Sequence, residues 1–246
     1  MTTLQTLKGF RDFIPQEKRE RDFVVRKIIT AFELAGFEPL ETPTIEYKET
    51  IMGKNGEEAD KLVYEFVDRG GREVALRYDQ TVPTARVMAQ YQSELPLPFR
   101  RYQIQNVFRA DKPQKGRYRE FTQCDIDIFG STDALADAEI LAATYQAYRQ
   151  IGFVDLELRV NDRQLLFAAL KPFASSQVST ASLIQSIDKL DKLSSEKVIQ
   201  ELVEKGLEVD QAKSALATTN QTIPSENLQQ IITLAIELGV PSECLK

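Results

Sequence analysis

Two runs of alternating polar and apolar residues, at positions 99–109 and 119–129, constrain the fold of this chain more than any other feature. Successive side chains of a β-strand point to opposite faces, so each run can be sorted into two sides. One side is rich in arginines, amides and carboxylates: Arg101, Gln103, Gln105 and Arg109 in the first run, and Arg119, Phe121, Gln123, Asp125 and Asp127 in the second. The other side is mostly apolar and carries Tyr102, Ile104, Phe108, Cys124, Ile126 and Ile128. Because the polar loop ADKPQKGRY joins the runs, they predict a long antiparallel hairpin.

The polar side of this hairpin has two interpretations. A solvent-facing sheet is the commoner cause of such alternation. However, exposed strands favour Lys, Glu and Thr, whereas Gln123, Asp125 and Asp127 are poor or indifferent strand formers. The second interpretation is therefore a sheet floor that binds a ligand, with Arg77 and Asp79 added from a preceding hairpin around residues 69–71. Opposite charges on one face would suit a zwitterionic ligand with phosphates, and the pattern alone leaves both interpretations open.

The remaining elements predict an α+β fold, an antiparallel sheet flanked by helices. A helix should begin at Pro15, present Phe23, Ile28 and Phe32 on one face, and end near Gly36. Further helices are expected at 81–92, 131–152 and 162–170, with a short strand at 156–161. Aromatic residues stop after position 173, and amphipathic helical stretches follow. We therefore predict a core domain over residues 1–173 and a small all-α insertion over residues 174–246.

Composition excludes several classes of chemistry. The chain has no histidine, which removes Ser-His-Asp triads, His-ligated metals and the usual general base. Only Cys124 and Cys244 occur, so cysteines cannot build a disulfide framework or a four-ligand zinc site. We expect Cys124 to be a small buried packing residue and Asp125 to make a structural hydrogen bond. The net charge is −6, yet seven basic residues against one acid between positions 100 and 119 suggest a polyanion site or a solvated basic loop. No apolar run approaches a membrane span or a secretory signal, so a cytoplasmic location is the default expectation.

Six collinear segments resemble the histidyl-tRNA synthetase family. The segment FRADKPQKGRYREFTQCDIDIFG (108–130) resembles its motif 2 hairpin, and LRYDQTVPTAR (76–86) resembles its histidine-binding loop. The opening KGFRDFIP (8–15) and the motif 1 segment GFEPLETPTIE (36–46) are also similar. RVNDRQLL (159–166) and SIDKLDKLSSEKVIQEL (186–202) match the surroundings of the helical insertion. The resemblance implies a class II synthetase fold and, through motif 1, a homodimer.

The resemblance also implies roles for individual residues. Arg109 matches the motif 2 arginine that contacts the α-phosphate of ATP and the substrate carboxylate, and it is the expected catalytic residue. Arg117 matches a residue that holds the outer phosphates. The expected histidine-binding residues are Asp79, Gln80, Thr81, Arg109, Gln123 and Asp127, and no protein metal site is expected. ATP with Mg²⁺, histidine and tRNA(His) are the expected substrates and partners, with no membrane.

The implied activity is that of a histidine–tRNA ligase, which activates histidine as the adenylate and transfers it to tRNA(His). The segments that follow in the family, motif 3 and the anticodon-binding domain, have no counterpart in this sequence, so we expect a truncated fragment whose activity alone is impaired. Two alternatives remain. One is a catalytically inactive regulatory subunit of the ATP phosphoribosyltransferase of histidine biosynthesis, against which Arg109, Gln123 and the loop PQKGRYREF argue. The other is a tRNA-binding or dimerisation module without chemistry.

Overall fold

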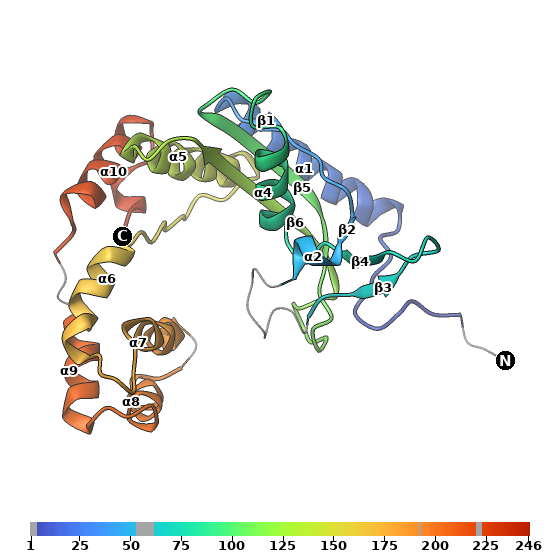
Figure 1. Cartoon of the computed structure of the whole chain (residues 1–246). Coiled ribbons are helices and arrows are strands. Elements are labelled where there is room, and N and C mark those ends of the chain that lie inside the picture. The colour runs from blue at the N-terminus through green and yellow to red at the C-terminus, as the bar shows by residue number, and fades with distance from the viewer. Residues whose placement is uncertain (1–3, 53–61, 192, 220–222) are drawn as a thin grey trace. The chain divides into compact units, whose positions relative to one another are not determined.

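The computed structural model describes residues 4–52, 62–191, 193–219 and 223–246, and the chain divides into two compact units, 1–156 and 157–246 (Figure 1). The sequence places the domain boundary at 173/174. Helix α6 (Arg163–Leu170) and the 3₁₀ helix η1 (Lys171–Phe173) nevertheless belong to the second unit. Leu170 is fully buried in the core of that unit, and Leu166 and Phe173 pack against the same core.

The first unit is built around the predicted hairpin. Strands β5 (Phe99–Phe108) and β6 (Glu120–Phe129) pair antiparallel over their whole length, which confirms the prediction. The short strand β1 (Glu38–Pro39) pairs parallel with β5, so the sheet order is β1-β5-β6. The register sets Arg101 opposite Asp127 and Gln105 opposite Gln123. The two polar sides that were sorted from the sequence therefore form one continuous surface.

Two long helices pack against the apolar side of the hairpin. Helix α1 (Pro15–Leu34) starts at Pro15 as predicted, and Gly36, with a φ of 82°, follows its C-terminal end. Helix α5 (Ala134–Gln150) is capped by the Asp133 side chain, which accepts a hydrogen bond from the Leu135 amide. Their shared core with the sheet consists of Ala31, Phe32, Phe37, Tyr102, Ala143 and Ala147, with Ile28, Ile104, Ile126 and Ile128 partly buried around it. Phe23 was predicted to share this face, but it is 54% exposed and is not part of this core.

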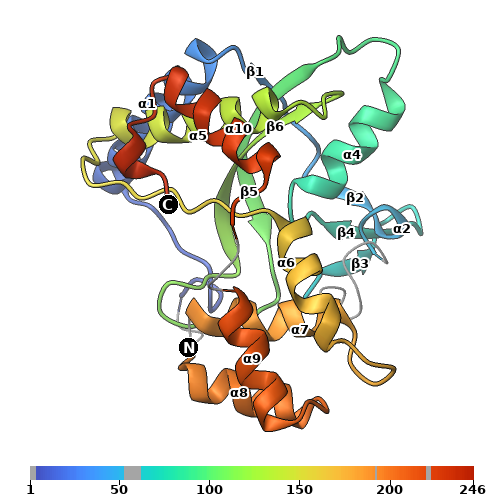
Figure 2. The same ribbon diagram turned by 90° about the vertical axis from the view of Figure 1, so that its left-hand side faces the viewer.

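A second, smaller sheet and a short helix lie toward the polar side of the hairpin. Its strand order is β2 (Ile45–Tyr47), β4 (Glu73–Leu76) and β3 (Glu65–Val67), all antiparallel, which confirms the predicted hairpin around residues 69–71. Helix α2 (Lys48–Ile51) packs on β4, and helix α4 (Thr81–Gln90) follows the sheet. In Figure 2, α4 and this sheet lie on one side of β5 and β6, and α1 lies on the other. The polar side of the hairpin is therefore covered over part of its length.

The second unit is helical. After α6 and η1 come α7 (Thr180–Ile187), η2 (Asp188–Asp191), α8 (Ser195–Glu204), α9 (Val209–Thr219), α10 (Glu226–Glu237) and η3 (Ser242–Cys244). The predicted strand at 156–161 is wrong as a regular element. In place of a strand, the described structure has an isolated parallel bridge between Leu158 and Leu245. None of the helices in the described residues is long and apolar enough to span a membrane.

Candidate active site

The polar side of the hairpin is a partly enclosed floor and not a solvent-facing sheet. On β5, Arg101 is 1% exposed and Gln103 is fully buried. On β6, Gln123 and Asp125 are half-buried, and the Asp127 side chain is 43% exposed. Buried polar groups in this number require partners from other elements. These partners come from residues 41–44 and from the start of α4.

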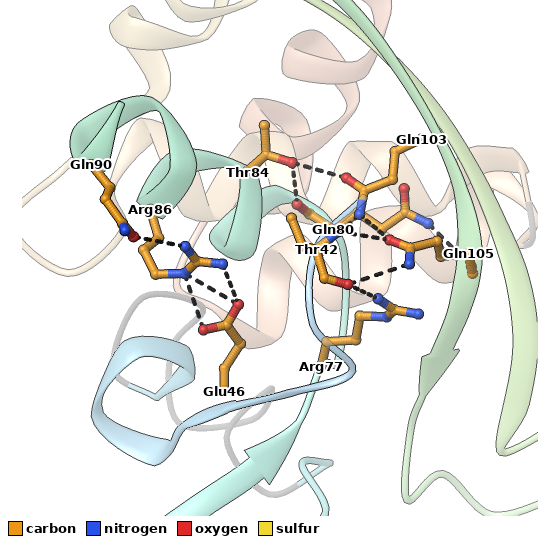
Figure 3. A network of polar contacts seen from close by, with 9 residues as sticks. All are labelled: Thr42, Glu46, Arg77, Gln80, Thr84, Arg86, Gln90, Gln103 and Gln105. Atoms are coloured by element: carbon orange, nitrogen blue, oxygen red, sulfur yellow. Dashed lines mark hydrogen bonds and ion pairs between the residues drawn. The ribbon is translucent and has the colours of Figure 1, made fainter. Parts of the chain in front are cut away.

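A hydrogen-bonded network of amides and hydroxyls fills the covered part of the floor (Figure 3). Gln103 Nε2 donates to Thr42 Oγ1 at 2.8 Å, and Gln105 Oε1 accepts from the Thr42 amide at 3.2 Å. From α4, Thr84 Oγ1 lies 3.2 Å from Gln103 Oε1 and donates to the Gln80 carbonyl at 2.7 Å. The network joins the chain after β1, the hairpin and α4 into one polar core.

Gln80 connects the start of α4 to both strands of the hairpin. Its side chain is fully buried, and Nε2 donates to the main-chain carbonyls of Gln105 at 3.1 Å and Gln123 at 3.0 Å. The Oε1 atom has no partner among the described residues. Gln80 was predicted to contact histidine. In the structure its donor is bonded to the protein and links the 79–81 loop to both strands, and a role toward histidine remains a prediction.

Arg109 lies where the hairpin leaves its polar floor. Its Nε donates to the Tyr78 carbonyl at 3.2 Å, and its guanidinium carbon lies 4.6 Å from the centre of the Tyr78 ring and 5.1 Å from that of Phe121. Such contacts restrict the rotamers of a long side chain and supply a cation–π attraction. Arg109 is thus a half-buried cation with a fixed direction.

The other predicted site residues lie at different levels of exposure. Asp79 is half-buried, and its Oδ1 accepts from the Val82 amide at 3.2 Å at the start of α4. Thr81 is the first residue of α4 and is exposed. Arg117 is exposed on a turn closed by two main-chain bonds with Gln114, in which Gly116 has a φ of 80°. Asp79 therefore joins the floor, whereas Arg117 lies on the connecting loop, and the roles of both toward a ligand remain predictions.

Two carboxyl groups, those of Asp127 and Asp125, act on one buried guanidinium on the floor, that of Arg101. Arg101 forms an ion pair with Asp127 through Nη2 and Oδ2, and its Nη1 donates to Gln103 Oε1 at 3.3 Å. Burial lowers the pKa of Arg101, although Asp127 and Asp125 oppose this effect. Burial also raises the pKa of Asp125, against the opposing influence of Arg101 and of a hydrogen bond from Gln123.

Arg101 is the residue that sequence reasoning missed. The sequence feature that could have identified Arg101 is its position opposite Asp127 when the two predicted strands are paired end to end. The cluster of basic residues between positions 100 and 119 is also not one surface. Arg100 points to the other side of the sheet and pairs with Glu139 at 2.7 Å, while Arg101 is buried and Arg119 donates to the Asp111 carbonyl at 3.0 Å. Only part of the local positive charge can therefore face a polyanion.

Cys124 departs from its predicted role as a buried packing residue. It lies on the apolar side as expected, but it is exposed, because α1 and α5 leave that part of the sheet open. Cys124 nevertheless lines a largely apolar pocket together with Ile28, Phe32 and Ile126. This apolar environment, with a smaller effect of Asp125, raises the pKa of Cys124 to about 11.

The profile of the family described as "Histidyl-tRNA synthetase" matches residues 9–235. The chain belongs to this family. The "Histidine--tRNA ligase" of Gloeobacter violaceus is 45% identical over 234 residues, which cover 86% of this chain and 50% of that relative. The crystal structure of histidyl-tRNA synthetase from Nostoc sp. PCC 7120 has a TM-score of 0.85 at 28% identity, covering 100% of this chain and 61% of that one. The predicted histidyl-tRNA synthetase fold is thereby confirmed.

A second solved structure has the same fold. It is described as an ATP phosphoribosyltransferase regulatory subunit/histidyl-tRNA synthetase from Bacillus halodurans C, with a TM-score of 0.79 and 21% identity over 100% of this chain and 68% of that one. At this identity the likeness concerns the fold alone. The chain spans about half the length of the curated histidine–tRNA ligases that it matches.

Proposed function

We propose that this chain carries the histidine-activating site of a histidine–tRNA ligase. The observation that supports this most is the fixed guanidinium of Arg109 at the end of a floor that carries Asp79, Gln123 and Asp127. A cation held in one direction next to carboxylates and amides matches a ligand with a carboxylate at one end and nitrogen donors at the other. Histidine beside the phosphates of ATP has this distribution of charge.

In the proposed reaction, one carboxylate oxygen of histidine attacks the α-phosphorus of ATP. The new P–O bond forms as the bond to the β-phosphate oxygen breaks, giving histidyl-adenylate and pyrophosphate. Arg109 would stabilise the charge that develops on the α-phosphate oxygens, and Arg117 would hold the outer phosphates. Mg²⁺ belongs to the nucleotide substrate, where it neutralises phosphate charge. No general base is required, because the nucleophile is already ionised, and this suits a site without histidine side chains.

Asp79, Thr81, Gln123 and Asp127 are proposed to bind histidine. A carboxylate that accepts the imidazole N–H discriminates against apolar analogues, because these would leave it without a partner. The adenylate would then pass its histidyl group to the 3′ end of tRNA(His), releasing AMP. This second step and the homodimer are proposed from the family resemblance.

The test is histidine-dependent exchange of pyrophosphate into ATP by the chain, with histidine binding measured beside it. We expect a low but histidine-dependent rate, which Arg109→Ala should reduce by roughly 10²–10³-fold because one preorganised partner of the transition state is lost. Asp127→Asn, which keeps an oxygen acceptor for Arg101, should raise the KM for histidine much more than that for ATP. Absence of both exchange and histidine binding in the parent chain would refute the proposal.

The regulatory-subunit alternative remains the second candidate, since the Bacillus halodurans structure that shares this fold is described in those terms. A regulatory subunit needs no preorganised cation for the α-phosphate, whereas Arg109 is held by Tyr78 and Phe121. The two functions differ in a direct assay. A regulatory subunit would alter the activity of an ATP phosphoribosyltransferase catalytic subunit mixed with it and would show no histidine-dependent exchange.

A further inference from the structure

Arg101 and Asp127 form an ion pair whose two members have very different access to solvent. Arg101 is 1% exposed, and the Asp127 side chain is 43% exposed. The guanidinium binds Oδ2 of Asp127 from inside the protein and also donates to Gln103. Gln103 is in turn held by Thr42 at 2.8 Å. The floor therefore fixes the guanidinium, and the guanidinium fixes one oxygen of Asp127.

The Asp127 side chain is 43% exposed as a whole, so the carboxylate is open to a ligand although Oδ2 is bonded to Arg101. A carboxylate held in this way presents one acceptor in a set direction, while the buried cation compensates its charge. We propose that Arg101 is a positioning residue that makes Asp127 an acceptor for the neutral imidazole ring of histidine and disfavours the protonated ring. The inference rests on the proposed function and specifies the form of the substrate that the site takes.

Other charged groups near Asp127 also affect the protonation of a bound imidazole ring. Asp125 lies two residues earlier on β6, and Asp79 approaches from the loop before α4. Asp133 and Asp137, at the start of α5, line a cavity at the edge of β6 together with Asp127. In a bound zwitterion the ammonium group would offset one of these acids. The remaining carboxylates favour a protonated ring, whereas Arg101, which is bonded to Asp127, and Arg109, at the end of the floor, oppose its protonation.

The chain itself makes a direct measurement possible. It contains no histidine, so the imidazole signals of added ¹⁵N-labelled histidine are free of protein background when no histidine tag is present. A pH titration by NMR with the chain in excess over histidine then reports the pKa of the bound ring. We expect the ring to be mainly neutral at pH 7, so that its bound pKa stays below about 7.

Arg101→Met removes the compensating charge and keeps an unbranched side chain of similar reach. The bound ring should then have a pKa higher by roughly one to two units than in the parent chain. Histidine affinity of the variant should rise about tenfold for each unit as the pH falls through that range. Arg100→Met is the matched control, because Arg100 is the neighbouring arginine on β5 but points to the other side and pairs with Glu139.

The outcomes separate this inference from the proposed function. A bound pKa above 7 in the parent chain, or the same bound pKa in the parent and Arg101→Met, would overturn the inference while histidine binding stands. If Arg101→Met does not fold, Asp127→Asn provides the second measurement, since loss of the acceptor charge should lower the bound pKa. An unchanged value there would also overturn the inference. Failure of the parent chain to bind histidine at any pH would overturn the proposed function and this inference together.

Discussion

Asp127→Ala should destabilise the first unit much more than Arg101→Met, although both substitutions remove the same ion pair. The difference comes from what each leaves behind. Without Asp127, the guanidinium of Arg101 remains buried at 1% exposure with no carboxylate bonded to it. Without Arg101, Asp127 remains a carboxylate that water reaches at 43% exposure. A stranded buried charge costs far more than a solvated one.

The magnitudes follow from this asymmetry. Breaking a buried pair from one side typically costs about 3–5 kcal/mol, and we expect about 3 kcal/mol for Asp127→Ala because water enters through the exposed half of the site. For Arg101→Met we expect about 1 kcal/mol, since the methionine fills the space of the arginine stem and one charged hydrogen bond is lost. In the double variant no charge is stranded. It should cost about 1.5 kcal/mol, which makes the coupling between the two substitutions about 2.5 kcal/mol.

Tyrosine signals allow the first unit to be followed alone. The chain has no tryptophan, and its eight tyrosines all lie at or before Tyr148, within residues 1–156. Thermal unfolding followed by near-UV circular dichroism therefore reports this unit. At roughly 2–4 °C per kcal/mol for a unit of this size, Asp127→Ala should lower the Tm by about 6–12 °C and Arg101→Met by about 2–4 °C.

Asp22→Ala is the matched control for this pair of variants. Asp22 is 41% exposed and also forms an ion pair, but its partner Lys18 is 58% exposed. Surface pairs of this kind contribute little, so the Tm should hardly change. Equal losses in Asp127→Ala and Arg101→Met, or purely additive effects in the double variant, would contradict the asymmetry and the buried state of Arg101.

Three further predictions concern other parts of the chain. Because the pKa of Cys124 is about 11, its alkylation at pH 8 should be roughly a hundredfold slower than that of an ordinary thiol, and the rate should rise up to about pH 11. Mass spectrometry of the Cys244→Ser variant measures the alkylation rate of Cys124. A rate that is flat above pH 9 would contradict the prediction. Hydrogen bonds from Lys189 and Ser186 depress the pKa of Glu201 to about 2, so its stabilisation of the second unit is complete above about pH 4.5 and is lost as the pH falls toward 2. Thermal unfolding followed by far-UV circular dichroism should therefore show that Glu201→Gln lowers the Tm at neutral pH, and that the Tm values of parent and variant become equal in acid. A difference in Tm that does not change with pH would be inconsistent with this prediction. Light scattering at micromolar concentration should give a homodimer that uses α1 and the segment around residues 39–45. A monomer, or a dimer formed only through residues 174–246, would count against this prediction.

Local periodicity explains which parts of the site could be predicted from sequence. The alternation in the two hairpin runs fixes which residues share a side, because the strand period is a property of neighbouring residues. Gln105, Gln123, Arg101 and Asp127 therefore share one side, as the faces predict, and the register of the strands then sets Gln105 opposite Gln123 and Arg101 opposite Asp127. The start of α1 at Pro15 and the turn at Gly36 could be predicted for the same reason, because each depends on the residue at that position and its neighbours in the sequence.

Burial of those same residues depends on segments that are distant in the sequence. Arg100 and Arg101 are neighbours, yet the first is part-exposed beside α5 and the second is enclosed by the floor. The difference requires the path of residues 41–44 and the position of α4, which no pattern in the hairpin contains. Cys124 shows the opposite case, since its side was predicted correctly but the space between α1 and α5 leaves it open.

The amide network shows why such a floor would be retained although it conflicts with ordinary core packing. Gln80, Thr84 and Gln103 are fully buried, and burying polar groups stabilises a fold only when their hydrogen bonds are complete. Here two amide oxygens, Oε1 of Gln80 and Oε1 of Gln123, and the Nε atom of Arg101 lack a hydrogen-bond partner among the described residues. An apolar core of the same volume would avoid this cost, but it could not direct hydrogen bonds from α4 to the carbonyls of both strands. Because those bonds fix Asp79 relative to Gln123 and Asp127, the polar core is better explained by the geometry of the site than by the stability of the unit.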